Sequence, residues 1–523
     1  MEKINIAALN FGSPIGCSEL LANSHSKLQS KESKKDLGQF FTPKELAIFM
    51  ASIADVDAKN NRIRILDPGC GTLMLSSALV EKVIEVNDNI EEIIIDIYEI
   101  DPSLQNIICW FGEQINVWGL ERNINIVINH FSDDFILANK DYRDSINRYD
   151  FIISNPPYFK IRKGDARLGV FNNSLNGQQN IYSLFMLMSS FLLKPEGQLI
   201  YLVPRSFTSG SYFQSFRELF LDNVFIKFIH LFSSRIAGFK KDNVLQENVV
   251  IKAINRDENI ENLISISKSI GLDDLNNNLI NVFREDELIK DLGDLLAIHI
   301  PSNVNEENAI QLFYQEGNSL ESLGFKVSTG PVVPFRSKEF LQEESNNNNC
   351  VPLFWMHNCK KMELVWPLKR GNKHEWIIDT LDSRSRLVDN ENVVILRRFS
   401  SKEEKAKLVA LPHIRNNYRY DKIGIENHLN YLYKINGELT EFETYGLSVL
   451  YNSFIFDSYF RSLNGNTQVN AKELNSIPMP STEIIIRIGQ EYLSLHNQCT
   501  DETQRIELID DIVNRLFVTQ NIE

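Results

Sequence analysis

Cysteine is scarce in this sequence and is not arranged in pairs. The 523 residues contain six cysteines, and none of them forms a C-x-x-C pair or stands beside histidines at zinc-ligand spacing. A disulfide framework and a metal site are therefore not indicated, and we expect no metal ion. Such cysteine usage fits a reducing cytoplasm, which is where we expect the protein to act.

Long hydrophobic runs are also missing. The most apolar stretch, IYSLFMLMSSFLL from residue 181, is followed at once by KPEG, so it falls well short of the roughly 20 apolar residues that a membrane-spanning helix needs. No signal-peptide pattern opens the chain. We therefore expect a cytoplasmic protein with no membrane partner.

Positive charge is in deficit. The chain has 54 Lys and Arg against 69 Asp and Glu, which gives a formal net charge of -15. A chain this acidic does not coat nucleic acid through its overall charge, although this does not exclude a local basic groove. The length predicts two or more domains, and the hydrophobic fraction of 43% is typical of a globular protein.

Strand-like and helical segments alternate in the first half of the chain, and this regular pattern changes after about residue 260, which predicts a domain boundary between residues 260 and 320. A helix is predicted over residues 42–54, with Thr42 as its N-cap and Pro43 as its first helical residue. Helical stretches separate five strand-like runs, which are RIRILD (62–67), IIIDIYEID (93–101), INIVIN (124–129), YDFIIS (149–154) and GQLIYLVP (197–204). This alternation predicts an α/β fold with a doubly wound, mostly parallel sheet.

Polar residues and glycines follow the first three strands. In LDPGCGT (66–72), two glycines stand between a strand and a helix, where backbone N–H groups can approach a ligand closely. Glu99 ends the next strand and could accept hydrogen bonds from a ribose diol, while Asp134 could bind an adenine amino group beside the Phe135 ring. The structural alternatives are a packing turn, a solvated strand-end carboxylate, and a loop aspartate next to a core phenylalanine.

The residues SNPPY (154–158) end the fourth strand in an unusual way. The exocyclic amine of a base is a poor nucleophile because its lone pair is delocalised, and two oxygen acceptors aimed at its two protons would localise that pair. Asn155 offers a side-chain oxygen, and Pro156, which has no N–H, offers a carbonyl whose direction is restricted by the second proline. Tyr158 offers a face for stacking a planar base. A simple proline-terminated strand explains neither the asparagine nor the tyrosine.

Together, these motifs resemble a known family. The order GQFFTP (38–43), LDPGCGT, YEID, DDF and NPPY is similar to that of the gamma-class N6-adenine DNA methyltransferases of restriction-modification systems, over roughly residues 35–260. The resemblance implies a Rossmann-like, S-adenosyl-L-methionine-binding catalytic domain at residues 1–300. It also implies a mixed α+β DNA target-recognition domain at residues 301–523.

The resemblance also implies roles for individual residues. Asn155, Pro156 and Tyr158 match the catalytic tetrapeptide, and Phe239 could be a second aromatic surface against the flipped base, its alternative being a core phenylalanine before a strand. The positions that match cofactor-binding residues are Thr42, Pro43, Asp67, Gly69, Gly71, Glu99, Asp134 and Phe135.

One position departs from the family pattern. Leu73 stands where the glycine turn of the family usually has a further glycine. Leucine would impair cofactor binding if this position required a positive φ or a very close approach of the ligand. We expect the leucine to be tolerated, because Gly69 and Gly71 remain and Leu73 can begin the following helix.

The second half of the chain contains a locally basic region. Residues 350–420 hold fourteen Lys and Arg against eight Asp and Glu, which favours a groove that faces phosphates. Residues 327–335 and 458–480 resemble the beginning and the end of the family's recognition domain. The basic positions include Lys360, Lys361, Lys369, Arg370, Lys373, Arg384, Arg386, Arg397, Arg398, Arg415 and Arg419, interleaved with Trp355, His357, Trp366 and Trp376.

The function predicted from the sequence is site-specific methylation of adenine N6 in double-stranded DNA. The protein would be the modification half of a restriction-modification system, with any cognate endonuclease acting separately. The alternatives are an N4-cytosine DNA methyltransferase and a non-catalytic, sequence-specific DNA-binding protein with an impaired cofactor turn. A fused restriction-methylation enzyme is a third alternative, although no separate nuclease segment is evident.

Overall fold

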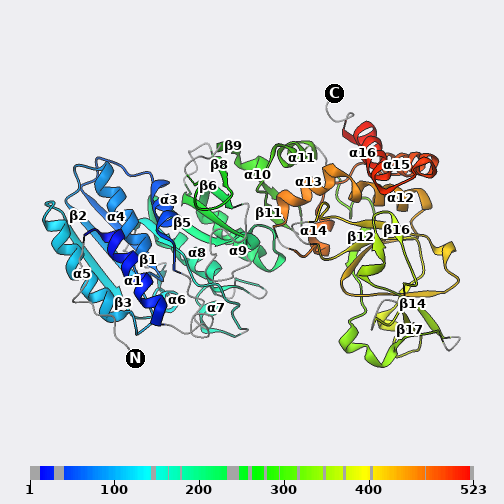
Figure 1. Cartoon of the computed structure of the whole chain (residues 1–523), viewed down its shortest axis with the longest axis horizontal. Coiled ribbons are helices and arrows are strands. Elements are labelled where there is room, and N and C mark those ends of the chain that lie inside the picture. Colours follow the sequence, from blue (N-terminus) through cyan, green and yellow to red (C-terminus); the bar gives the residue numbers. More distant parts are fainter. Residues whose placement is uncertain are drawn as a thin grey trace. The chain divides into compact units, whose positions relative to one another are not determined.

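The computed structural model divides the chain into two compact units, Met1–Glu285 and Asp286–Glu523, which Figure 1 colours from blue to green and from green to red. Each unit is described by itself. The structure describes residues 12–28, 41–142, 149–162, 164–172, 174–176, 179–232, 247–256, 262–275, 280–293, 295–314, 318–345, 349–368, 373–400, 404–465 and 467–518.

The first unit is built around a nine-stranded sheet with the order β3-β2-β1-β4-β5-β7-β6-β8-β9. The five strands from β3 to β5 run parallel to their neighbours, whereas β7 is antiparallel to both β5 and β6. The predicted doubly wound, mostly parallel sheet is confirmed. The strands are β1 (Arg62–Pro68), β2 (Glu92–Tyr98), β3 (Asn125–Phe131), β4 (Tyr149–Ser154), β5 (Leu193–Pro204), β6 (Val224–Phe232), β7 (Asn248–Asn255), β8 (Leu263–Ser269) and β9 (Ile280–Arg284).

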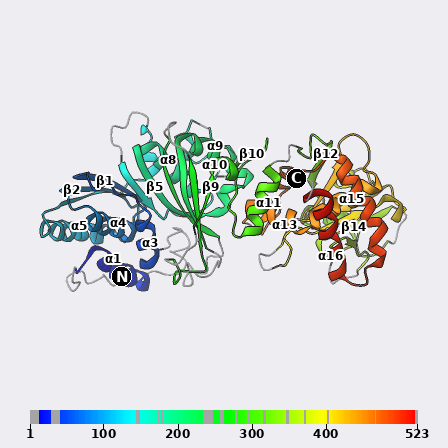
Figure 2. The same cartoon turned by 90° about the horizontal axis from the view of Figure 1, so that it is seen from above.

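Helices cover both faces of this sheet (Figure 2). Alternate residues of β5 point to opposite sides: Ile200 and Leu202 belong to the hydrophobic cluster beneath α1, α3, α4 and α5, while the Tyr201 hydroxyl lies 2.6 Å from the Ser189 hydroxyl of α8. Burial on both faces explains why these strands are almost continuously apolar. The helices are α1 (Pro14–Leu28), α3 (Lys44–Ser52), α4 (Met74–Val86), α5 (Gln105–Leu120), α6 (Phe135–Ala138), α7 (Ala166–Gly169), α8 (Ile181–Leu192) and α9 (Gln214–Asn223).

The start of α3 differs from the prediction. The helix begins at Lys44, and Pro43 is its N-cap residue, with no side-chain capping hydrogen bond. The prediction that Thr42 is the N-cap and Pro43 the first helical residue is therefore wrong. The Thr42 hydroxyl instead accepts a hydrogen bond from a side chain at the end of β4, because tertiary packing offers it a partner that the local sequence does not reveal.

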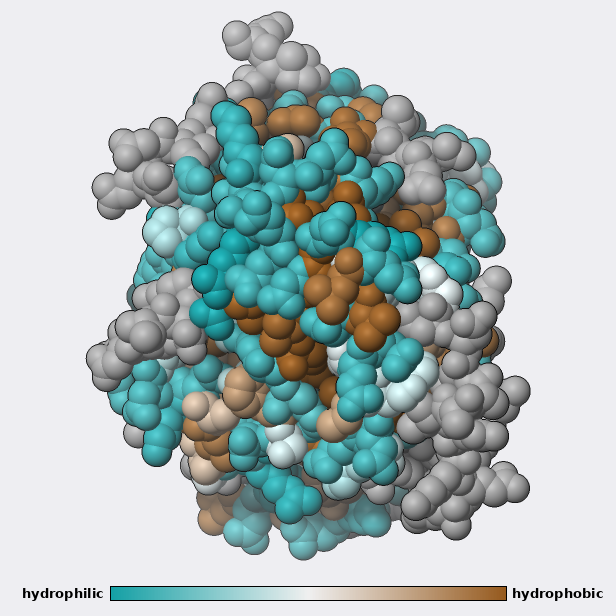
Figure 3. Space-filling model, turned by 90° about the vertical axis from the view of Figure 1, so that its left-hand side faces the viewer, coloured by the Kyte–Doolittle hydropathy of each residue, from teal (hydrophilic) through white to brown (hydrophobic). Residues whose placement is uncertain are grey.

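The outer edge of the sheet at β3 carries an apolar groove. It lies between α5 and β3 and is lined by residues that include Ile108 and Cys109 of the helix and Ile126, Ile128 and His130 of the strand. Figure 3 shows this end of the unit, with hydrophobic residues gathered near the middle of the face. None of the predicted site residues lines this groove, so the candidate site lies elsewhere.

The second unit is of the α+β type, as predicted. It contains a four-stranded sheet, β12-β22-β19-β20, and a five-stranded sheet, β13-β17-β14-β21-β18. The strands of the two sheets are β12 (Phe325–Thr329), β13 (Leu341–Gln342), β14 (Cys350–Phe354), β17 (Trp376–Ile378), β18 (Val388–Asp389), β19 (Val393–Arg397), β20 (Ala410–His413), β21 (Lys422–Ile425) and β22 (Leu429–Lys434). The helices of eight or more residues are α11 (Val304–Tyr314), α12 (Glu441–Asn452), α13 (Phe454–Leu463), α15 (Thr482–Leu495) and α16 (Glu502–Val513).

Residues 286–300 belong to the second unit, whereas the sequence placed the boundary at residue 300, within a range of 260–320 that includes the observed division. The short strands β10 (Ile289–Asp291) and β11 (Leu296–Ile298) pair with each other. Leu295 and Ala297 pack against Leu463 of α13. These apolar contacts explain why the division falls before residue 300.

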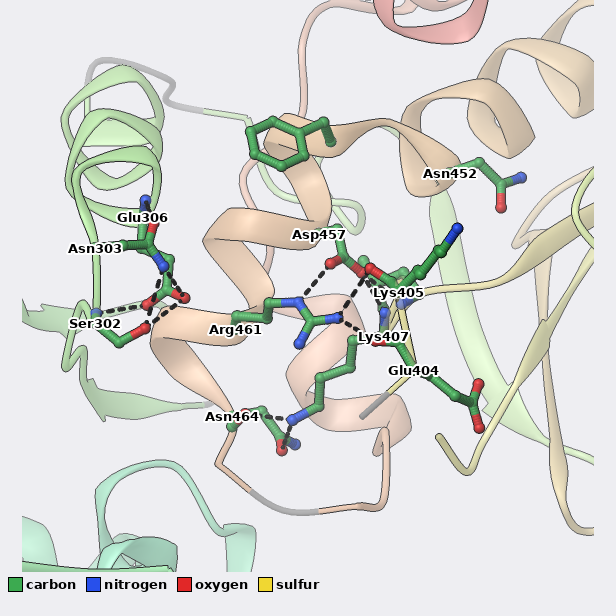
Figure 4. A network of polar contacts seen from close by, with 12 residues as sticks. Ser302, Asn303, Glu306, Glu404, Lys405, Lys407, Asn452, Asp457, Arg461 and Asn464 are labelled. Atoms are coloured by element: carbon green, nitrogen blue, oxygen red, sulfur yellow. Dashed lines mark hydrogen bonds and ion pairs between the residues drawn. The ribbon is translucent and has the colours of Figure 1, made fainter. Parts of the chain in front are cut away.

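Helix α13 is the centre of a polar network in the second unit (Figure 4). One carboxylate oxygen of Asp457 accepts the backbone N–H groups of Lys407 and Leu408 at 2.6 and 2.8 Å, and the other accepts from Arg461 Nε at 2.6 Å. The buried Lys407 ammonium donates to the side-chain and backbone oxygens of Asn464. Both buried charges are therefore fully engaged in holding the segment before β20 against α13.

In the described part of the chain, no helix is both long and apolar enough to cross a membrane.

Candidate active site

Four parallel strands bring the predicted site residues to one edge of the sheet. Asp67 lies on β1, Glu99 follows β2, Asp134 follows β3 and Asn155 follows β4. Because neighbouring strands from β3 to β4 are parallel, their carboxyl ends meet at this edge, where open α/β sheets bind ligands. Residues that are far apart in the sequence thus form one candidate site.

The glycine turn after β1 is held by β2. Gly69 and Cys70 donate their backbone N–H groups to the Tyr98 carbonyl at 2.8 and 3.1 Å. Gly69 has φ = 77° and Gly71 has φ = 55°, and a Cβ atom on Gly71 would come within 3.3 Å of the Phe41 ring. Backbone geometry therefore favours glycine at both positions, and the limited space beside Phe41 favours it further at Gly71.

Leu73 also has a positive φ. Its φ is 62°, and it is the residue that precedes α4, so the expectation that Leu73 begins the helix is wrong. The left-handed conformation costs a non-glycine residue roughly 1–2 kcal/mol. The Leu73 side chain is completely buried in the core of the unit, and this burial offsets the backbone strain. The position does adopt the positive φ that glycine favours, and the fold accommodates leucine there. That cofactor binding also tolerates the leucine stays a prediction.

Glu99 connects the glycine turn to the end of β2. One of its carboxylate oxygens accepts the Gly71 N–H at 2.9 Å, and the other accepts the Asp101 N–H at 2.9 Å. Burial raises the pKa of the carboxyl group above its ordinary value. The alternative of a solvated strand-end carboxylate does not apply, because the side chain is only 6% exposed.

Asp67 is buried with one oxygen left open. Oδ2 accepts the Ser76 N–H at 3.3 Å, but Oδ1 has no hydrogen-bond partner among the described residues. Burial raises the pKa of this carboxyl group to about 7. The Thr72 hydroxyl, in the same turn, is likewise buried and unpartnered. Unsatisfied buried polar atoms are costly, so this pair is suited to a polar ligand. Thr72 belongs to the LDPGCGT motif, but the sequence alone indicates no role for it.

Asp134 caps the short helix α6. Its Oδ1 accepts the N–H groups of Ile136 and Leu137, both at 3.0 Å, while Oδ2 lies 3.5 Å from the Arg167 guanidinium. The neighbouring Phe135 ring is 2% exposed and packs against Tyr98 and Phe185. In this structure, Phe135 makes the contacts of a core residue.

Asn155 lies between a threonine and a tyrosine. Its Nδ2 donates to Thr42 Oγ1 at 3.1 Å, and its Oδ1 lies 2.6 Å from the Tyr158 hydroxyl. That hydroxyl also lies 2.8 Å from the Leu202 carbonyl; with one proton it can donate to only one of the two acceptors at a time. Burial raises the pKa of Tyr158 well above its usual range, so the hydroxyl stays neutral and available as a donor. Both Asn155 and Tyr158 are half-buried, whereas Pro156 is buried.

The region of the predicted second aromatic surface is described only in part. Phe239 lies outside the described residues. The next described strand begins at Asn248, which pairs with Pro204 at the carboxyl end of β5. The Asn248 amide is buried, and neither its oxygen nor its nitrogen has a hydrogen-bond partner among the described residues. The sequence analysis missed this residue, since an asparagine at a strand start carries no distinctive signal.

In the second unit, much of the basic excess is used internally. The side chains of Lys361, Arg397 and Arg398 donate to backbone carbonyls of Asn452, Cys359 and Asn427. Such side chains hold the fold together and are not free to meet phosphate.

The remaining predicted basic and aromatic residues divide into four groups. The aromatic group includes His357, whose ring stacks on that of Trp355 with the centroids 6.4 Å apart. Trp355, Trp366 and Trp376 are at least partly buried, and Trp366 packs against Trp376. Lys369 and Arg370 lie outside the described residues. Arg384 and Arg415 pair with carboxylates at 3.9 and 3.8 Å, and Arg386 lies over the Phe340 ring. The exposed basic residues of the predicted set include Lys360, Lys373 and Arg419.

Comparison with known proteins gives consistent results. Residues 73–237 match the family described as Eco57I restriction-modification methylase. The chain is 35% identical over 473 residues to the type II methyltransferase M.BsuBI of Bacillus subtilis and 31% identical over 461 residues to M.PstI of Providencia stuartii, in each case covering 88% of this chain and 90% of the relative.

Among solved structures, the type IIL restriction-modification enzyme MmeI in complex with DNA aligns with a TM-score of 0.52, covering 96% of this chain and 76% of that one. At 13% identity, this likeness concerns the fold alone. The sequence relatives decide the family: the chain belongs to the type II methyltransferases of restriction-modification systems, which methylate DNA with S-adenosyl-L-methionine as the methyl donor.

Proposed function

We propose that this protein methylates the N6 amine of adenine at a specific site in duplex DNA, as the modification half of a restriction-modification system. The observation that carries the proposal is the position of Asn155, whose side-chain amide stands at the tip of β4 with its nitrogen on Thr42 and its oxygen beside Tyr158. A cognate endonuclease would act separately. An N4-cytosine target is the alternative, because its exocyclic amine would meet the same acceptors.

The turn after β1 fits the methyl donor. S-adenosyl-L-methionine carries an ammonium group and ribose hydroxyls, and the open Asp67 oxygen and the buried Thr72 hydroxyl are suited to such groups. Glu99 already accepts two backbone N–H groups, but each carboxylate oxygen has a second lone pair for a ribose hydroxyl. When bound, the cofactor supplies a methyl group that is activated by the sulfonium to which it is attached.

Asn155 and Pro156 would activate the target amine. The Asn155 side-chain oxygen and the Pro156 carbonyl would each accept one N–H of the amine, which localises the nitrogen lone pair for attack. Thr42 accepts from Asn155 Nδ2 and so orients the amide with its oxygen away from the threonine. Neither acceptor is a base at neutral pH, so the proton that the nitrogen loses after methylation would go to water.

Tyr158 would both stack on the base and release the catalytic oxygen. Its hydroxyl can donate to Asn155 Oδ1 before substrate binds and to the Leu202 carbonyl afterwards, since both acceptors are within 2.8 Å. The change would free a lone pair of Asn155 for the incoming amine. Stacking on an aromatic ring contributes roughly 1–3 kcal/mol, which would offset part of the few kcal/mol needed to flip a base.

The second unit would recognise the DNA sequence. Its exposed basic side chains, among them Lys360, Lys373 and Arg419, are suited to phosphate contacts. Phe335, in the predicted entry segment, is 68% exposed, and the Arg336 guanidinium lies 5.2 Å from the centre of its ring. An exposed aromatic and cationic pair is suited to base and phosphate contacts.

The test is to express the wild-type protein and Asn155→Ala in cells without other DNA methylation. Nucleosides of the DNA are analysed, and modified positions are mapped by sequencing. We expect N6-methyladenine at one short sequence in the wild type and none in the variant. N4-methylcytosine would favour the alternative target. Unmodified DNA, together with no binding of S-adenosyl-L-methionine in calorimetry, would favour a non-catalytic DNA-binding protein.

A further inference from the structure

Arg167 joins two loops at the carboxyl edge of the first unit's sheet. It lies in α7, in the segment that follows the catalytic tetrapeptide. Its Nη1 pairs at 3.5 Å with Oδ2 of Asp134, the aspartate that follows β3. The centre of the guanidinium lies 5.7 Å from that of the Phe159 ring, the residue after Tyr158. One side chain thus contacts the proposed adenine site of the cofactor and the neighbour of the proposed stacking tyrosine.

The orientation of Arg167 is set by Asp165. Asp165 accepts the backbone N–H of Arg167 at 3.0 Å, and its carboxylate takes Arg167 Nε at 2.8 Å and Nη2 at 2.7 Å. This two-point contact lowers the pKa of Asp165 and keeps both groups charged. With Nε and Nη2 engaged, Nη1 is the nitrogen that reaches Asp134. A planar fork can hold both carboxylates in this way, whereas a lysine ammonium is a single point charge.

Asp134 has capacity for a ligand on the side of Arg167. Its Oδ1 accepts two backbone N–H groups, and Oδ2 faces the arginine at a long ion-pair distance. A carboxylate oxygen has two lone pairs, so Oδ2 can also accept a ligand amine. An amine bound there would fix Asp134 and, through Arg167, the segment that begins at Phe159.

We propose that Arg167 is a positioning residue that couples cofactor binding at Asp134 to target-base binding at Tyr158. The inference rests on the proposed function. Its physical basis is that a cofactor amine at Asp134 would restrict Arg167, which also contacts the Phe159 ring, so that less conformational entropy would be lost when DNA binds. Cofactor and DNA should therefore strengthen each other's binding, and by thermodynamic linkage the factor is the same in both directions.

The experiment measures this coupling factor. DNA affinity is measured with and without saturating S-adenosylhomocysteine, on a duplex that carries the site found by methylation mapping. The affinity for S-adenosylhomocysteine is then measured with and without that duplex. We expect the wild type to show a factor within the roughly 5- to 150-fold range that is typical of coupled sites. In Arg167→Met, we expect the factor to fall below about twofold, where coupling is negligible.

Arg256 offers a matched control. Its guanidinium also lies over an aromatic ring, 4.1 Å from the centre of Phe225, and pairs with Glu285 at 3.8 Å. It has no contact with the predicted site residues in the described part of the unit. Arg256→Met should leave the coupling factor at the wild-type value.

A second variant keeps the test possible if Arg167→Met does not fold. Asparagine is as good an N-cap as aspartate, so Asp134→Asn keeps the cap of α6 but weakens the pair with Arg167. It should also lower the coupling factor. Hydrogen exchange of residues 159–172 supplies a further readout: cofactor should slow exchange there in the wild type and not in Arg167→Met.

The outcomes separate this inference from the proposed function. If the wild type binds neither S-adenosylhomocysteine nor the mapped duplex, the proposed function fails. If it binds both but Arg167→Met keeps the wild-type coupling factor, the inference is overturned while the function stands. A variant that weakens both affinities equally, with the factor unchanged, shows a structural role only and also overturns the inference.

Discussion

Two buried aspartates, one in each unit, are treated very differently. Asp457 in the second unit accepts three hydrogen bonds from Lys407, Leu408 and Arg461. Asp67 in the first unit has a weak bond to Ser76 on one oxygen and no partner among the described residues on the other. The first arrangement holds a fold together. The second leaves polar capacity unused at a sheet edge, which is expected of a site that completes its bonding with a ligand.

Backbone strain adds to the contrast at Asp67, although it also occurs at Met362 in the second unit. The turn next to Asp67 contains Leu73 in a left-handed conformation, besides two glycines with positive φ. In the second unit, basic residues such as Arg397 and Lys361 hold backbone carbonyls. The turn next to Asp67 therefore combines a strained leucine with two buried polar atoms that have no partner among the described residues, a combination that is common at functional sites.

The largest expected effect is in the first unit, at the proposed catalytic asparagine. Asn155→Ala removes one of the two proposed acceptors of the target amine. Loss of one such electrostatic contact typically lowers kcat about 10²- to 10³-fold. Binding of S-adenosyl-L-methionine should be nearly unchanged, because the glycine turn is untouched. Turnover is measured by transfer of labelled methyl groups to DNA, and a near-normal rate would rule out the two-acceptor mechanism.

Asp67→Asn should stabilise the first unit relative to the wild type, and this stabilisation should grow as pH rises. The folded pKa of Asp67 is about 7, above the unfolded value of 3.8, so the favourable contribution of the protonated group is fully present below about pH 4 and is lost as pH rises to about 7. Asparagine resembles the protonated group and escapes this loss, which amounts to about 4 kcal/mol by linkage. The measurement is urea unfolding without cofactor at pH 4, 5.5 and 7. A stability difference that does not change with pH would contradict the open-carboxylate interpretation.

The same substitution at Asp457, whose two carboxylate oxygens are both hydrogen-bonded, should change stability in the opposite direction. Asp457→Asn weakens the contact with Arg461 and should destabilise the second unit by about 2 kcal/mol, as expected for a hydrogen bond to a charged group. Asp511→Asn is the control, because Asp511 and Arg515 form an exposed ion pair that contributes less than about 1 kcal/mol. Unfolding followed by tryptophan fluorescence gives both values. Equal effects at Asp457 and Asp511 would remove the contrast between the two units.

Variants of Tyr158 separate the contribution of its ring to activity from that of its hydroxyl. Tyr158→Ala removes the stacking surface and should reduce methylation by the equivalent of roughly 1–3 kcal/mol. Tyr158→Phe keeps the ring but loses the hydrogen bonds to Asn155 and Leu202, and Tyr158→Trp keeps an aromatic face. Both should lose much less activity than alanine in steady-state assays. Equal losses in all three variants would show that stacking is not the role of Tyr158.

The smallest expected effect tests the strain at Leu73. Alanine and glycine at this position both remove the buried leucine side chain. The difference between their free energies of unfolding therefore reports the strain in the backbone. Glycine adopts φ = 62° without strain, and Leu73→Gly should be more stable than Leu73→Ala by about 1 kcal/mol. This order is the reverse of that in an ordinary helix. Urea unfolding of the two variants measures the difference, and the usual order, with alanine more stable, would contradict the assignment of strain.

Part of the first unit could be predicted from local sequence alone. The alternation of strand-like and helical runs predicted the parallel sheet, and Gly69 and Gly71 marked the turn after β1. The helix α1 was not predicted, and Thr42 was assigned to capping when its hydroxyl contacts Asn155. The roles of the site residues stay predictions. What the structure adds is which of them lie together.

The second unit was less accessible to sequence reasoning. A count of charges predicted a basic groove over residues 350–420, but the count could not tell Lys360, which is exposed, from Arg397, which holds the Cys359 carbonyl, or from Lys373, whose ammonium lies over the Trp355 ring. Charge is a property of composition. Whether a charged group is free to meet a phosphate depends on neighbours contributed by other strands.

The sequence by itself determined the fold class, the glycine turn and the asparagine and tyrosine at the end of β4, because each depends on hydrophobic periodicity or on residues within a few positions of each other. Only the tertiary structure decided that Thr42 orients Asn155, that Arg167 reaches Asp134 and that Asp67 is left with an open oxygen. These three facts depend on the parallel strands, whose carboxyl ends bring distant residues to one edge of the sheet. Long-range contacts of this kind leave no periodic signal in the sequence.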